Sequence, residues 1–132
     1  MERIELKTRE STELVDITEK VKELVKCACV ESGICVIFTR HTTSGIIINE
    51  NESGMKQDIV TLLNELVPKG KGYLHDRIDN NAHSHLRAVL LGTSGSIPVD
   101  RGELVLGTWQ SIFFVECDGP RRREVCVNVV LG

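Results

Sequence analysis

The sequence predicts an α+β fold in which a few helices lie among the strands of a sheet. Apolar residues recur at helical spacing in three separate segments. Most other segments are short runs rich in Val and Ile that end at turn residues. From residue 95 onward only strands are expected, so helices and strands do not alternate as they do in a βαβ fold.

The first half of the chain contains four expected strands. Apolar and charged residues alternate over 2–8, which is typical of a half-exposed strand, and 14–17 is a second short candidate. Residues 34–39 (ICVIFT) are apolar at both odd and even positions, so this strand is expected to be covered on both faces. A short run at 46–48 follows.

Three helices are expected. The first runs to about Cys29, with Asp16 or Thr18 as its cap, and its unit ends at Gly33. The second spans 53–66 and is stopped by Pro68. After a loop at 69–80, the third spans about 84–91 and ends at Gly92.

The last third is expected to form a meander. Its strands are predicted at 95–99, 104–106, 108–116 and 123–131, joined by turns at 100–102 and 118–120. A sheet with Val and Ile on both faces needs cover on both sides. Helices can cover one face, and a neighbouring subunit is the candidate for the other.

Composition limits the function classes. The chain has 132 residues, which predicts a single domain over 1–132, and its 16 basic and 19 acidic residues give a net charge of −3. This balance argues against nucleic acid and anionic membranes as partners. Six of the first ten residues are charged, and no apolar run approaches the roughly 20 residues that span a bilayer. A cytoplasmic protein is therefore expected.

The five cysteines form neither a CxxC pair nor an even set. We expect reduced thiols, mostly buried as small apolar residues. A redox or nucleophilic role is the alternative, with no residue favoured.

A first polar cluster, His41-Thr42-Thr43-Ser44-Gly45, follows a buried strand. Hydroxyls and backbone N–H groups there can donate to an oxyanion, although a turn that satisfies its own backbone is the alternative. Asn49 and Glu50 follow shortly after, and Glu50 is either a site carboxylate or a residue at a helix start.

A second cluster places three of the four histidines within eleven residues, namely His75, His83 and His85. Together with Asp76 and Asp79 they suit a divalent metal ion. On an ideal helix His83 and His85 lie about 200° apart and cannot share a metal. They could do so only if Ser84 caps the helix, and unrelated surface or core histidines are the alternative.

A third cluster is Gly107-Thr108-Trp109-Gln110. On the expected strand 108–116, Thr108, Gln110 and Glu116 share one face, which indicates either a pocket or a cross-strand ladder of hydrogen bonds. The basic run 121–123 is interpreted as a solvated edge, with contact to a phosphate as the alternative.

Three segments together resemble the YjbQ family, also called UPF0047: HTTSGIIINENE at 41–52, DNNAHSHLRAVLLG at 79–92 and IPVDRGELVLGTWQSIFFVECDGPRRREV at 97–125. The resemblance covers the chain from about residue 5 to the end. It implies a two-sheet β-sandwich with about three helices, assembled as a homotrimer. It also implies a secondary thiamine-phosphate synthase activity, a transferase reaction that joins hydroxymethylpyrimidine diphosphate to thiazole phosphate.

The resemblance places the active site near a subunit boundary. Expected catalytic residues are His41, Glu50, Asp79, His85 and Gln110. Expected substrate and anion ligands are Thr42, Thr43, Ser44, Asn49, Asn80, Gly107, Thr108 and Trp109, and the expected ligands of a divalent metal ion, zinc or magnesium, are His75, His83 and His85. Two alternatives remain: another metal-assisted enzyme acting on small phosphorylated metabolites, or a non-catalytic trimer that binds such an anion.

Overall fold

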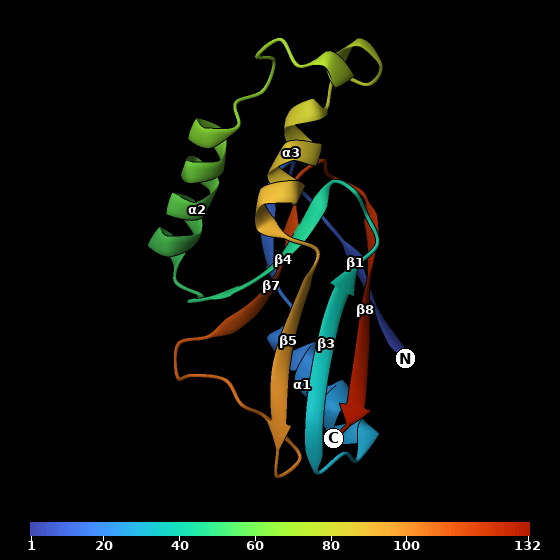
Figure 1. Ribbon diagram of the computed structural model, residues 1–132. Helices are drawn as coiled ribbons and strands as arrows, with labels where there is room; N and C mark the ends of the chain where they lie inside the picture. The colour runs from blue at the N-terminus through green and yellow to red at the C-terminus, as the bar shows by residue number, and fades with distance from the viewer.

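A computed structural model describes residues 1–132 and has an α+β fold with two antiparallel sheets and three α-helices. Sheet A has five strands in the order β1-β8-β3-β5-β6, and sheet B has three in the order β2-β7-β4. The sheets pack face to face as a sandwich (Figure 1). The strands are β1 (Glu2–Lys7), β2 (Glu13–Asp16), β3 (Ser32–Thr39), β4 (Ser44–Asn49), β5 (Ser94–Asp100), β6 (Glu103–Leu104), β7 (Ser111–Glu116) and β8 (Arg122–Leu131).

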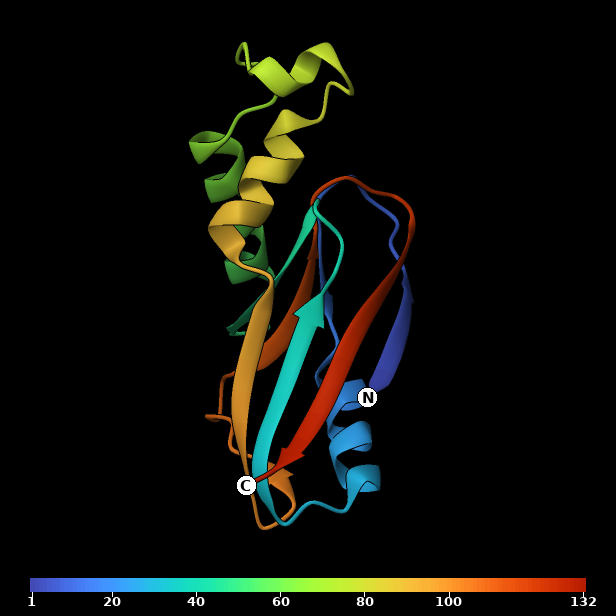
Figure 2. The ribbon, with the colours of Figure 1, turned by 45° about the vertical axis from the view of Figure 1, so that its right-hand side comes forward.

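The main core lies on the inner face of sheet A. Inward side chains of its strands, such as Ile37 and Val125, pack on Ile112 and Phe114 of β7. Helix α1 (Thr18–Ala28) adds Val21 and Val25 to the same core. Sheet B covers the upper part of this face and α1 the lower part (Figure 2). The carboxylate of Asp16 accepts a hydrogen bond from the backbone N–H of Thr18 at 2.9 Å, which fixes the start of α1.

Helices α2 (Ser53–Leu66) and α3 (Ala82–Leu91) cover the outer face of sheet B. Leu63 of α2 and Leu91 of α3 pack with Phe113 and Val115, so β7 is buried on both faces. The Glu52 carboxylate accepts the N–H groups of Gly54 and Met55, and α2 therefore begins where the apolar spacing predicts.

The outer face of sheet A has no cover within the chain. Ile34, Phe38 and Val130 lie there and are each between 40% and 49% exposed. Cross-strand register places Ile34 directly opposite Val130, so the exposed side chains form a connected apolar strip. The open face is the one for which a neighbouring subunit is the expected cover.

Three local expectations from the sequence are wrong. Gly33 lies inside β3 rather than ending a helical unit. Helix α3 begins at Ala82, so Ser84 does not cap it; its hydroxyl is buried and donates to the carbonyl of Cys117 at 2.5 Å. Strand β7 begins at Ser111, because residues 107–110 form a tight turn in which the backbone N–H of Gln110 donates to the carbonyl of Gly107.

All five cysteines are free thiols. Cys35, Cys117 and Cys126 are buried as expected, whereas Cys27 and Cys29 at the end of α1 are exposed. No helix is long and apolar enough to cross a bilayer.

Candidate functional site

Three loops meet at one end of the sandwich, which we call the loop end. They are the β1–β2, β3–β4 and β7–β8 connections, at the upper end of the two sheets in Figure 2. The first polar cluster, His41 to Ser44, lies in the second of these loops. The second cluster lies above it in the η1 turn (Leu74–Arg77) and the first turn of α3.

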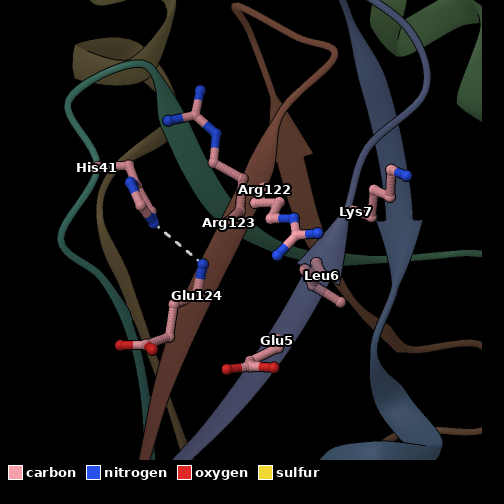
Figure 3. A pocket seen from close by; sticks show the side chains of 7 residues that line it. All are labelled: Glu5, Leu6, Lys7, His41, Arg122, Arg123 and Glu124. Atoms are coloured by element: carbon pink, nitrogen blue, oxygen red, sulfur yellow. Dashed lines mark hydrogen bonds between the residues drawn. The ribbon is translucent and has the colours of Figure 1, made fainter.

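His41 is half-buried beside β8. Its Nε2 accepts a hydrogen bond from the backbone N–H of Glu124 at 3.0 Å (Figure 3). The acceptor role leaves Nε2 unprotonated, so the neutral ring carries its proton on Nδ1. Burial, followed by the positive charge of Arg123, holds the pKa of His41 below its usual value. At neutral pH this side chain is an uncharged hydrogen-bond donor through Nδ1.

Of the three hydroxyl residues that follow His41, two are buried and one is exposed. Thr43 and Ser44 are buried, and both hydroxyls are engaged within the chain. Ser44 shares a hydrogen bond of 2.8 Å with Thr39, while Thr43 Oγ1 accepts one of 2.7 Å from Arg123. Both residues therefore hold the His41 loop in place, and Thr42 is the exposed hydroxyl of the three.

A buried ion pair lies beneath this loop. The guanidinium of Arg123 contacts both carboxylate oxygens of Glu116, and neither side chain is more than 3% exposed. Thr8 and the backbone N–H of Asp118 donate to the same carboxylate at 2.8 and 3.1 Å. Burial alone would raise the pKa of Glu116, but these donors outweigh it and lower the pKa below its usual value. The interpretation of the 121–123 run as a solvated edge is therefore wrong for Arg123.

A hollow of about 420 Å³ lies between His41 and the upper ends of β1 and β8. Lys7 and Arg122 are directly opposite each other across these strands, and neither has an acidic partner within the chain. Glu124 is engaged by Arg3 and Arg40 at 3.2 and 3.7 Å. We call this hollow, shown in Figure 3, the His41 hollow. It opens on the outer, uncovered side of sheet A.

A second hollow, of about 730 Å³, lies across the β7–β8 connection. It is lined by Asp79, Asn80 and His83 of the second cluster, together with Arg87 of α3. His85 is not among the lining residues, and its ring lies 4.7 Å from that of His75. We call this the Arg87 hollow.

The expected metal group of His75, His83 and His85 does not form within one chain. Both His83 and His85 lie in the helix, where side chains two positions apart point in opposite directions. No three side chains of His, Cys, Asp or Glu are gathered closely enough to hold a metal ion.

The remaining expected site residues lie at the far end of sheet B. Strands β4 and β7 run from the loop end to Asn49 and Ser111, which pair with each other. Glu50 and the turn at 107–110 adjoin this end. A six-residue strand spans about 17 Å between its first and last residues, so one chain separates Gln110 and Trp109 from His41. Trp109 is 73% exposed.

Comparison with known proteins identifies the family. The family model described as "UPF0047 protein YjbQ-like" matches residues 2–132. The chain belongs to the YjbQ family. A UPF0047 protein from Archaeoglobus fulgidus is 50% identical over 95% of this chain and 97% of its own length. YugU of Bacillus subtilis is 34% identical over 96% of both chains.

Solved structures of the YjbQ family agree with the fold. A YbjQ-like protein of unknown function from Sulfolobus solfataricus matches with a TM-score of 0.97 and 42% identity, over 99% of this chain and 96% of its own. A hypothetical protein from Aeropyrum pernix matches with a TM-score of 0.96 and 38% identity, over 99% and 98% of the two chains. The two-sheet α+β fold that the YjbQ resemblance implied is therefore confirmed.

Sequence reasoning missed Lys7, Arg87 and the Glu116–Arg123 pair. One signal for the pair was present, because Glu116 ends a strongly apolar segment and a carboxylate buried there needs a cation. Lys7 carried no signal, since its importance arises only from its register opposite Arg122.

The ion pair leads to a stability prediction. Replacing Arg123 by Met strands a buried carboxylate, so the free energy of unfolding should fall by about 3–5 kcal/mol. The double variant Glu116→Leu/Arg123→Met should recover much of this loss. Urea unfolding followed by circular dichroism measures both. A double variant that is less stable than Arg123→Met would contradict this account.

The histidines lead to a pH prediction. Burial is the main cause that lowers the pKa of both His41 and His83 in the folded chain. The unfolded chain therefore takes up protons first on acidification, and stability falls as the pH drops below about 6.5. His41→Gln should flatten this dependence, because Gln does not titrate. Urea midpoints between pH 8 and pH 5 test this, and an unchanged slope in His41→Gln would argue against it.

Proposed function

We propose that the chain binds the phosphate groups of a small metabolite in the His41 hollow, and that its reaction is of the thiamine-phosphate synthase type. The observation that carries the proposal is the pairing of Lys7 with Arg122. Like charges directly opposite each other on neighbouring strands repel, and neither side chain forms an ion pair within the chain. An anion placed between them removes the repulsion and gains two charge-assisted hydrogen bonds.

Two other charged side chains of the hollow are already paired with opposite charges. Arg123 is neutralised by Glu116, and Glu124 by Arg3 and Arg40. The unpaired charges that line the hollow are then the negative charge of Glu5 and the positive charges of Lys7 and Arg122, so positive charge is in excess. Neutral His41 adds an uncharged donor, and Thr42 is an exposed hydroxyl in the same loop.

These groups suit a reaction that releases diphosphate. The thiazole nitrogen bonds to the pyrimidine methylene carbon while the bond from that carbon to the diphosphate oxygen breaks, and the bonding electrons leave with diphosphate. Lys7 and Arg122 would offset the charge that develops on the leaving group, and His41 would donate a hydrogen bond from Nδ1. No covalent nucleophile is needed. Because one chain does not gather three metal ligands, no step is assigned to a metal ion.

We further propose that the complete site forms between copies in a homotrimer. The His41 hollow opens on the uncovered apolar face of sheet A, and the far-end group of Glu50 and Gly107–Gln110 presents an exposed Trp109. A contact that joins the loop end of one copy to the far end of the next is heterologous, and three such contacts close a ring. Exposed Trp side chains are frequent anchors of such contacts.

Inorganic diphosphate provides the binding test. Isothermal titration of the purified protein should show saturable binding, and Arg122→Gln should weaken it about tenfold, as expected for one lost charge-assisted hydrogen bond. Arg9→Gln is the matched control, because Arg9 is exposed but does not line the hollow. Equal diphosphate affinity of the two variants would contradict the proposal that diphosphate binds in the His41 hollow.

The reaction and the shared site can be tested together. Formation of thiamine phosphate from both substrates should be lost in His41→Ala and in Gln110→Ala. Trimers refolded from an equal mixture should regain about a quarter of wild-type activity, since about one site in four then combines two intact halves. Wild-type protein that binds diphosphate without forming product would support the binding-only alternative and overturn the transferase proposal. Mixed trimers without activity would overturn the shared site.

A further inference from the structure

Arg87 of α3 is a buried cation without a counter-charge. Its side chain is only 4% exposed, yet it takes part in none of the five ion pairs of the chain. Nε donates to the carbonyl of Val67 at 3.0 Å and Nη1 to Thr12 at 3.4 Å. Neutral acceptors satisfy these donors but leave the charge uncompensated. A buried guanidinium normally has an anionic partner, because its desolvation is costly.

The groups around Arg87 do not supply that charge. The Cys117 thiol lines the same hollow, but burial raises its pKa to about 12, so it is uncharged at neutral pH. Asp118 is committed to Arg121 and Asn81, each at 3.0 Å. Asp79 lines the hollow but forms no ion pair with Arg87. Burial lowers the pKa of Arg87 itself, in keeping with the missing partner.

Two further polar atoms of this region lack partners. His83 Nδ1 and Asn81 Oδ1 are buried, and neither makes a hydrogen bond within the chain. Both residues line the Arg87 hollow, as does the exposed Lys69. When Nδ1 of His83 carries a proton it can donate to an anion held by Arg87. Buried polar atoms without partners are uncommon in folded proteins and point to a missing ligand. Asn81 Oδ1 only accepts, so it would need a hydroxyl of that ligand, such as the P–OH of a protonated phosphate.

We propose that the Arg87 hollow is a second oxyanion site, which binds a phosphate group through Arg87, Lys69 and His83. It is separate from the His41 hollow, because the two share no lining residue: the His41 hollow is lined from β1, β8 and the β3–β4 loop, and the Arg87 hollow from α3 and several loops, including the β7–β8 connection. Three separate donors can bind several oxygens of one ligand at once, which suits a phosphate group better than a carboxylate with its two oxygens. The inference does not require the proposed reaction.

The test uses inorganic phosphate and a chain in which anion binding by the His41 hollow is weakened. Arg122→Gln serves as the background, and phosphate binding that depends on Lys69 and Arg87 then reports the Arg87 hollow, because neither residue lines the His41 hollow. Isothermal titration should show saturable binding in this background. Adding Lys69→Gln should weaken it about threefold to fivefold, as for loss of one exposed charge. Lys71→Gln is the control, because Lys71 is an exposed lysine of the same loop that does not line the hollow.

A second variant tests Arg87 without removing its charge. Arg87→Lys keeps the cation but loses the planar fork, and phosphate affinity should fall at least about tenfold. Acetate titrated in parallel should bind more weakly than phosphate. The proposal is overturned if Arg122→Gln shows no saturable phosphate binding, if Lys69→Gln and Lys71→Gln behave alike, or if acetate binds as tightly as phosphate. Because Arg122 is already replaced, failure here leaves the His41 hollow untouched.

Discussion

The buried pair of Glu116 and Arg123 is the interaction on which the loop end depends. It joins β7 of sheet B to β8 of sheet A, and each of its remaining hydrogen bonds fixes another part of that end. Arg123 donates to Thr43 and so holds the His41 loop. Thr8, just after β1, and the backbone N–H of Asp118, in the β7–β8 connection, both donate to Glu116. A buried ion pair contributes little net stability, so its value here lies in placing these three loops.

The loop end therefore carries two hollows of different character. The His41 hollow is framed by strand residues, and its positive charge comes from the register of β1 against β8. The Arg87 hollow is framed by a helix and by loops, and its charge comes from one buried side chain. Arg121, at the end of the β7–β8 connection, lines the Arg87 hollow, and the next residue, Arg122, lines the His41 hollow. A change in Glu116 or Arg123 should therefore affect both hollows.

The sequence predicted local elements well where packing follows one simple period. Helix α2 has the predicted bounds, because its apolar spacing, the Glu52 cap and Pro68 all agree. Glu116 and Arg123 were harder to interpret, since a run of three arginines is usually solvated and only the fold brings this one to a buried carboxylate. The motif residues were found, but their arrangement was not. Six residues of β4 place Ser44 and Asn49 at opposite ends, a distance that motif spacing alone does not convey.

The position of Trp109 also determines which structural changes the intrinsic tryptophan fluorescence of this protein can detect. It is the only Trp of the chain, and it lies on an exposed turn rather than in the core. Its indole is already in water in the isolated chain, so unfolding changes its surroundings little. Intrinsic fluorescence should consequently change little when the sandwich unfolds. It should respond instead to any surface that covers the 107–110 turn. A blue shift on raising the protein concentration would reveal association, with no label added.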